Sequence, residues 1–90
     1  MVKILIEKPT KEKLDSLNID KWGSWGCDIS KFDWEYSDEE VCYIYEGKVV
    51  VKTDEETVEI NPGDLVTFPK GLKCNWDVSE PIRKVYKFNY

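Results

Sequence analysis

Apolar and polar residues alternate with a period of two over much of the chain. Phe32, Trp34 and Tyr36 fall on one side of this pattern, whereas Asp33 and Glu35 fall on the other. Such alternation is typical of a β-strand that buries one face. Similar runs between turn residues predict strands over residues 2–6, 41–45, 48–53, 57–60, 65–68, 72–78 and 82–88.

The segments between these strands are too short to hold crossover helices. Residues 54–56 predict a hairpin connection, and Gly47 is expected to end one strand just before the next begins. One or two helical turns are predicted over residues 10–17, and residues 22–26, with two Trp beside two Gly, are predicted to form a loop. Closely spaced strands joined by turns favour an all-β fold, either a closed or a sandwiched antiparallel barrel.

The composition indicates one small acidic domain. Ninety residues leave no room for a second core, so residues 1–90 are predicted to form a single domain. The net charge of −5 argues against nucleic acid as a partner, and no apolar run is long enough to span a membrane. Three cysteines, an odd number, and a first segment unlike a signal peptide predict free thiols and a cytoplasmic location.

Two blocks of residues carry a more specific signal. In the first block, six residues separate Glu40 from Gly47; the second runs from Gly63-Asp64 through Phe68-Pro69 and Gly71 to Cys74. Their joint spacing resembles the two conserved motifs of the cupin superfamily, and especially short cupins similar to the barrel domains of ureidoglycine aminohydrolase. The resemblance covers a motif-bearing core of about residues 32–88. It implies a small antiparallel, jelly-roll-like β-barrel with a short N-terminal helical turn.

The same resemblance raises the question of a metal. In metal-binding cupins a His-x-His pair precedes the glutamate that matches Glu40, and a further His stands at the position of Cys74. This chain contains no histidine. A carboxylate and a thiolate can both ligate a divalent metal, so Glu40 and Cys74 are candidate metal ligands. Two ligands are too few for a tight site, and a metal-free domain is the favoured prediction.

The positions of the missing pair depend on the register. If three residues separate the pair from the glutamate, Trp34 and Tyr36 occupy its positions, and Trp cannot bind a metal. A separation of four residues would instead offer Asp33 and Glu35. That register would turn the neighbouring aromatic rings outward into water, which is unfavourable for a domain with a small core.

The inward rings predict a ligand pocket in the barrel mouth. Ring faces suit flat or cationic organic molecules, while a Tyr hydroxyl or a Trp N–H can fix their orientation. The alternative is that the same side chains simply fill the interior of a small barrel. The predicted pocket residues are Trp34, Tyr36, Glu40, Phe68, Cys74, Trp76 and Tyr86.

Lys84 is the remaining candidate, because alternation places it on the same face as Tyr86 and Phe88. Inside the barrel it would pair with Glu40, bind a ligand carboxylate, or act as a base or nucleophile. The alternative, which we expect, is that its stem snorkels to water at the rim. Without imidazole, proton transfer would fall to Glu40, Lys84 or Tyr36, with Cys74 as a further candidate.

Three functional hypotheses remain open. The first is a metal-free cupin, predicted to be a homodimer, that binds a small metabolite in an aromatic pocket. The second is a metal-assisted hydrolase, isomerase or lyase acting on a small nitrogenous or carbohydrate-derived substrate. The third is a structural module whose exposed strands, residues 2–6 and 49–51, serve oligomerisation.

Overall fold

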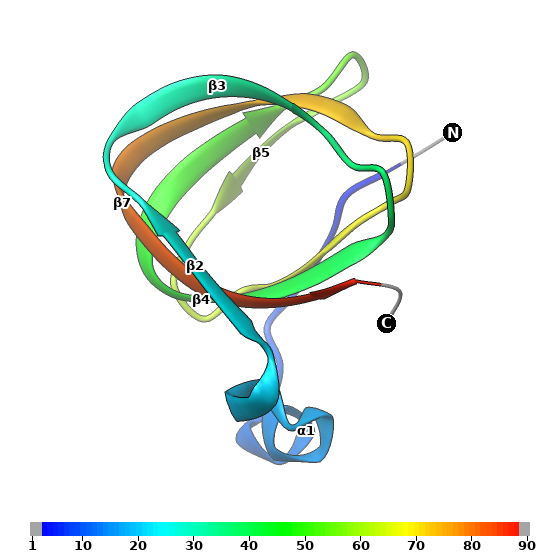
Figure 1. The fold of residues 1–90 in the computed structure, drawn as a ribbon, viewed down its shortest axis with the longest axis vertical. Helices are drawn as coiled ribbons and strands as arrows, with labels where there is room; N and C mark the ends of the chain where they lie inside the picture. The colour runs from blue at the N-terminus through cyan, green and yellow to red at the C-terminus, as the bar shows by residue number, and fades with distance from the viewer. Residues whose placement is uncertain (1–2, 89–90) are drawn as a thin grey trace.

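Antiparallel strands make up most of the chain in the structure, a computed structural model that describes residues 3–88 (Figure 1). The all-β prediction is confirmed. The elements are β1 (Leu5–Glu7), α1 (Lys11–Leu17), the 3₁₀-helix η1 (Ile19–Lys21), β2 (Gly23–Cys27), β3 (Ser30–Glu35), β4 (Glu40–Lys52), β5 (Thr57–Ile60), β6 (Leu65–Phe68) and β7 (Lys73–Phe88).

The strands form one curved sheet that wraps around the hydrophobic core, and Figure 1 shows this curvature. Its order is β1-β6-β4-β7-β2, while β3 also pairs with β7 and β5 also pairs with β4. One edge of β7 therefore pairs with β4, and the other edge pairs with β3 near its start and with β2 near its end. The sheet of the described residues is barrel-like but not closed, so the prediction of a closed sheet is wrong.

Two long strands, β4 and β7, each replace a pair of shorter predicted strands: residues 41–45 and 48–53 for β4, and residues 72–78 and 82–88 for β7. β7 continues past Pro81, and β4 continues past Gly47, where the register with β7 shifts. Gly47 has a φ of 96°, and a Cβ on it would overlap the carbonyl oxygen of Pro81. Glycine is therefore required at this irregularity, which bends the strand without ending it.

The irregularity changes which side chains of β4 point inward. Before it, Glu40, Cys42 and Ile44 are buried at even positions; after it, Val49 and Val51 are buried at odd positions. Because side chains alternate along a strand, a one-residue shift exchanges the two faces. Both ends of this long strand can therefore contribute to the same interior.

The segment predicted to be a loop, residues 22–26, lies largely within β2. Gly26 pairs with Arg83 of β7, and a Cβ on Gly26 would lie 2.8 Å from the carbonyl oxygen of Ile82. A glycine within a strand often marks such a close backbone approach. The loop prediction was wrong because it counted glycine as a chain breaker, and Trp25 was thereby left out of the barrel.

The helical prediction near the N-terminus is confirmed by α1, which lies outside the barrel in Figure 1. The hydroxyl of Thr10 caps the helix by accepting a hydrogen bond from the Lys13 amide at 3.1 Å. β1 forms an edge of the sheet by pairing with β6. Val2, included in the predicted first strand, lies outside the described residues. Neither described helix has the length and apolar character needed to cross a membrane.

Candidate ligand-binding pocket

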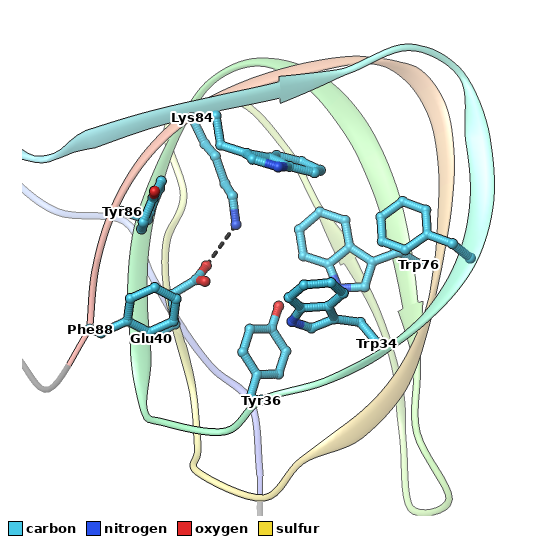
Figure 2. Close-up of a pocket in the computed structure, with 9 residues that line it drawn as sticks. Trp34, Tyr36, Glu40, Trp76, Lys84, Tyr86 and Phe88 are labelled. Carbon is cyan, nitrogen blue, oxygen red and sulfur yellow. Dashed lines mark hydrogen bonds and ion pairs between the residues drawn. The ribbon is translucent and has the colours of Figure 1, made fainter.

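One end of the barrel holds a pocket with a cavity volume of about 260 Å³. It is framed by β2, β3, the start of β4 and β7, strands that come together because β7 pairs with each of the others. Figure 2 shows the side chains converging on the opening. The lining residues are Trp25, Phe32, Trp34, Tyr36, Glu40, Trp76, Lys84, Tyr86 and Phe88.

A buried ion pair crosses this pocket. The ammonium of Lys84 donates a 2.6 Å hydrogen bond to the Oε2 of Glu40, and each residue is only 5% exposed (Figure 2). Lys84 lies opposite Ile44 in the β4–β7 register, so its long side chain runs along the strands to reach Glu40. The prediction that Lys84 snorkels to water is wrong, because a carboxylate within reach supplies the counter-charge inside the barrel.

Aromatic rings surround the same ammonium. The Nζ of Lys84 lies 5.1 Å from the ring centroid of Trp25, 5.0 Å from that of Trp76 and 5.9 Å from that of Tyr86. A cation within about 6 Å of a ring face is attracted by the ring quadrupole, and more strongly when both are desolvated. Lys84 thus occupies an aromatic cage as well as an ion pair.

The walls and the rim of the pocket differ in exposure. Phe32 stacks on Trp76 with their centroids 6.0 Å apart, and Trp25 meets Trp76 edge to face. At the rim, Trp34 is 52% exposed, and Phe88 is exposed as well. A pocket with a packed wall and exposed rim rings offers apolar contact to a molecule entering from solvent.

Tyr36 contributes a hydroxyl to this surface. Its ring stacks on Phe68 at 4.7 Å, and in Figure 2 its hydroxyl points toward the middle of the pocket. Burial, and then the nearby charge of Glu40, raises the pKa of Tyr36 far above its ordinary value. The phenol therefore stays protonated and suits hydrogen bonding to a ligand better than removal of a proton.

The indole N–H of Trp76 is a second polar group at the site. It is buried and makes no hydrogen bond of good geometry with the described residues. It does lie close enough to Tyr36 and Cys74 to lower the pKa of each, against the larger opposing effect of burial. A buried donor without an acceptor is unfavourable, and a ligand oxygen would satisfy it.

Two predicted pocket residues lie behind the lining. Phe68 is fully buried beneath Tyr36, and Cys74 belongs to the hydrophobic core, where its thiol faces the carbonyl oxygen of Trp34 at 3.7 Å. Burial raises the pKa of Cys74 to about 11. The structure therefore gathers Trp34, Tyr36 and Glu40 around one opening but leaves Cys74 outside it.

A divalent metal does not fit the residues at this site. Among the described residues, no group of three His, Cys, Asp or Glu side chains comes together as a metal site would need. Asp33 and Glu35 are exposed on the outer side of β3, while Trp34 and Tyr36 line the pocket. Glu40 instead holds the ammonium of Lys84, so one cationic group of the chain itself lies beside this carboxylate.

Sequence reasoning missed three lining residues, namely Trp25, Phe32 and Phe88. Two of them carried a usable signal, because Phe32 alternates with Trp34 and Tyr36, and Phe88 alternates with Lys84 and Tyr86. Trp25 carried none, since its strand was predicted to be a loop.

A family model for the EutQ-like cupin domain matches residues 14–86. The chain belongs to this family of cupins. A DUF861 family protein of known structure from Thermotoga maritima is 53% identical, and the match covers 96% of this chain and 99% of that one with a TM-score of 0.94. The cupin resemblance seen in the two motif blocks is thus confirmed, and the narrower likeness to ureidoglycine aminohydrolase plays no part in these matches.

Two further matches involve EutQ itself. The acetate kinase EutQ of Clostridioides difficile (strain 630) is 31% identical over 55 residues, which are 61% of this chain and 35% of that kinase. This EutQ-like cupin domain therefore spans about a third of the length of that relative. A structure of Clostridium difficile EutQ, 21% identical, superimposes with a TM-score of 0.68 over 97% of this chain and 68% of that one, which supports the shared fold.

Proposed function

We propose that this cupin domain binds a small organic molecule in the aromatic pocket, without a metal. The observation that carries the proposal is a buried Lys84–Glu40 pair lining a cavity of about 260 Å³ whose other walls are aromatic rings. A few polar groups in an otherwise apolar concavity are typical of small-molecule sites. A molecule with one flat ring would place its faces against Phe32, Trp34 and Phe88.

The charges favour a neutral or anionic ligand over a cation. Lys84 already occupies the ring faces and the carboxylate that a cationic ligand would need. An ammonium has three donors, and Glu40 is its one hydrogen-bond partner among the described residues. A carbonyl or carboxylate oxygen of a ligand would accept from the other donors of Lys84, from the Trp76 indole and from the Tyr36 hydroxyl.

The name of the acetate kinase EutQ is relevant to this choice of ligand class, since acetate is a small carboxylate. The matched segment covers only part of that kinase, so phosphoryl transfer is not carried over to this chain. Acetate is nevertheless a sensible first probe. A phosphorylation assay with ATP and acetate tests whether the kinase activity in that relative's name extends to this chain, and product formed above a heat-inactivated control would show that it does.

Intrinsic fluorescence provides a direct test, because three of the four tryptophans, Trp25, Trp34 and Trp76, line the pocket. We expect saturable quenching by benzoate or benzamide and none by benzyltrimethylammonium, which carries the same ring on a cation. Trp34→Phe should reduce the quenching. Trp22 lies outside the pocket, so Trp22→Phe should leave the quenching unchanged. Tighter binding of the cation than of benzoate would contradict the proposed ligand class.

Two results would favour the other hypotheses. Stoichiometric zinc, manganese, nickel or iron in protein purified from its native host would favour the metal-assisted enzyme. No quenching or thermal stabilisation by a broad panel of small acids, amides and alcohols would favour the structural module. For that module, and for the proposed homodimer, the subunit interface would be edge strand β1, where Leu5 and Ile6 are exposed. Light scattering tests this by comparing the oligomeric mass of Ile6→Lys with that of the unmodified chain.

A further inference from the structure

We propose that Lys84 is a nucleophile that captures a small aldehyde or ketone in the pocket as an imine, with Glu40 handling the proton. This inference rests on the proposed function, because the carbonyl compound must first enter the aromatic pocket. It adds a covalent step to simple binding and assigns distinct roles to the two members of the buried pair.

The placement of Lys84 is the first argument. Among residues 3–88 it is the lysine that is buried, yet its side chain lines the pocket. A molecule in the pocket would therefore meet this amine with the rings of Trp25, Trp76 and Tyr86 around it. The neutral amine is the form that attacks a carbonyl, and the amine of Lys84 already donates a hydrogen bond to Glu40, a group able to accept its proton.

Glu40 is the second argument, because imine formation needs a group that accepts and returns protons at the amine. Its Oε2 lies 2.6 Å from the Nζ of Lys84, within the range required for direct proton transfer. No other carboxylate of the described residues lines this pocket. In Figure 2 the two side chains point toward one another across the opening, so a substrate would meet both.

The step balances without any further reagent. Lys84 gives one ammonium proton to Glu40, and the freed lone pair forms a C–N bond at the carbonyl carbon while the C=O π electrons move to oxygen. That oxygen takes the proton back from Glu40. A second proton then passes from nitrogen through Glu40 to the hydroxyl, which leaves as water as the C=N bond forms. The ammonium and the carbonyl compound thus become a protonated imine and water, with no change in oxidation state.

The surroundings suit the product as well as the reactants. The positive charge stays on the same nitrogen, so the ion pair with Glu40 and the ring contacts with Trp25 and Trp76 are retained. The pocket therefore loses a water molecule but keeps its net charge. The aromatic lining would hold the organic part of the adduct.

Reductive trapping tests the inference on the full chain. The protein is incubated with benzaldehyde and sodium cyanoborohydride, which reduces an imine to a stable benzylamine, and the modified lysines are mapped by mass spectrometry. Because the pocket holds the aldehyde beside the amine, Lys84 should be labelled at least about tenfold faster than exposed Lys87 on the same strand. Labelling of Lys84 no faster than that of Lys87 would overturn the inference.

Variants separate the roles of the pair. Glu40→Gln should slow labelling of Lys84 about tenfold or more and leave Lys87 unchanged, since the group that accepts and returns the protons at Lys84 is lost. If this variant does not fold, Glu40→Asp is used instead: it keeps the carboxylate but withdraws it from the Nζ of Lys84, so labelling of Lys84 should slow while that of Lys87 stays the same. Unchanged labelling of Lys84 in a folded Glu40→Asp protein would contradict the assigned roles.

Benzoate, which forms no imine, distinguishes the two proposals. Quenching by benzoate without a benzyl adduct on Lys84 would reject imine formation and keep the binding proposal. Absence of both quenching and adduct would reject both. Suppression of Lys84 labelling by benzoate, with Lys87 unaffected, is the result expected if both hold.

Discussion

Two buried carboxylates in this protein accept hydrogen bonds from different kinds of donor, Asp64 from a backbone amide and Glu40 from a lysine side chain. Asp64, 2% exposed, follows the turn between β5 and β6, where its Oδ2 accepts the Asn61 amide at 2.8 Å. The exposed ammonium of Lys8 lies 2.5 Å from its Oδ1 without making a hydrogen bond of good geometry. Glu40, similarly buried, receives its hydrogen bond from Lys84, a side chain 44 residues away.

The difference shows how a buried carboxylate can be assigned to the scaffold or to the site. Asp64 bonds a backbone amide three residues away, so local chain geometry holds it in place and it stabilises a turn. Glu40 bonds a side chain that lines a cavity, and a ligand can compete for that contact. Burial alone does not separate the two roles, whereas the identity of the partner does.

Removing one member of the pocket pair should have the largest effect. Lys84→Met leaves Glu40 buried without a counter-charge, and the free energy of unfolding should fall by about 3–5 kcal/mol. Urea unfolding followed by circular dichroism measures this change, with Lys87→Met as the exposed control. A loss below about 1 kcal/mol would mean that Glu40 reaches water, and it would remove the distinction between the two carboxylates.

Breaking the turn contact should have a smaller effect. Asp64→Ala leaves the Asn61 amide without its acceptor, which should lower the free energy of unfolding by about 1–3 kcal/mol. Lys8→Ala, whose side chain is 71% exposed, should change it by less than about 0.5 kcal/mol. If Lys8→Ala were as destabilising as Asp64→Ala, the ion pair rather than the backbone bond would hold this turn.

Replacing both members of the pocket pair should change stability least among the pocket variants. Glu40→Leu combined with Lys84→Met removes both buried charges together, and the free energy of unfolding should stay within about 1 kcal/mol of the original or rise. Quenching by benzoate should nevertheless be lost. A double variant that still binds benzoate equally well would show that the pair has no part in recognition.

Labelling of the Cys42 thiol should stay unchanged in Asp64→Ala and in the Glu40→Leu/Lys84→Met double variant, provided that they fold. Burial raises the pKa of Cys42 to about 12, while Lys84 lowers it and Glu40 raises it by smaller amounts. At pH 8, below this value, the buried thiol stays protonated, so an aromatic disulfide reagent should label half-buried Cys27 and spare Cys42. Labelling of Cys42 in Asp64→Ala or in the double variant would report an opened barrel rather than a local loss.

The sequence predicted the strands well where alternation was uninterrupted. It predicted them less well where close contacts between backbone segments determine whether a strand continues. Phe32, Trp34 and Tyr36 were assigned to the correct face, because all three line the pocket on the inner side of the sheet. The continuity of β4 and β7 could not be predicted, because it depends on Gly47 fitting against Pro81, two residues far apart in the chain. Trp25 was missed for the same reason, since Gly26 approaches the backbone at Ile82.

The site was predicted in its composition but not in its main contact. Alternation placed Lys84 on an inward face, and the cupin motif placed Glu40 there. Whether these side chains meet depends on the curvature of the sheet and on the reach of lysine along β7, neither of which a linear pattern contains. The choice between a paired and a snorkelling lysine therefore needed the three-dimensional structure.

The irregularity at Gly47 also limits how the chain can change in length. Removing a single residue between 45 and 48 would rotate the start of β4 by one position, turning Glu40, Cys42 and Ile44 to the outside and bringing Val41, Tyr43 and Tyr45 in. Removing two would preserve their orientation. Among descendants of this sequence, length variation at this point should therefore come in even steps wherever the cavity and its charged pair are kept.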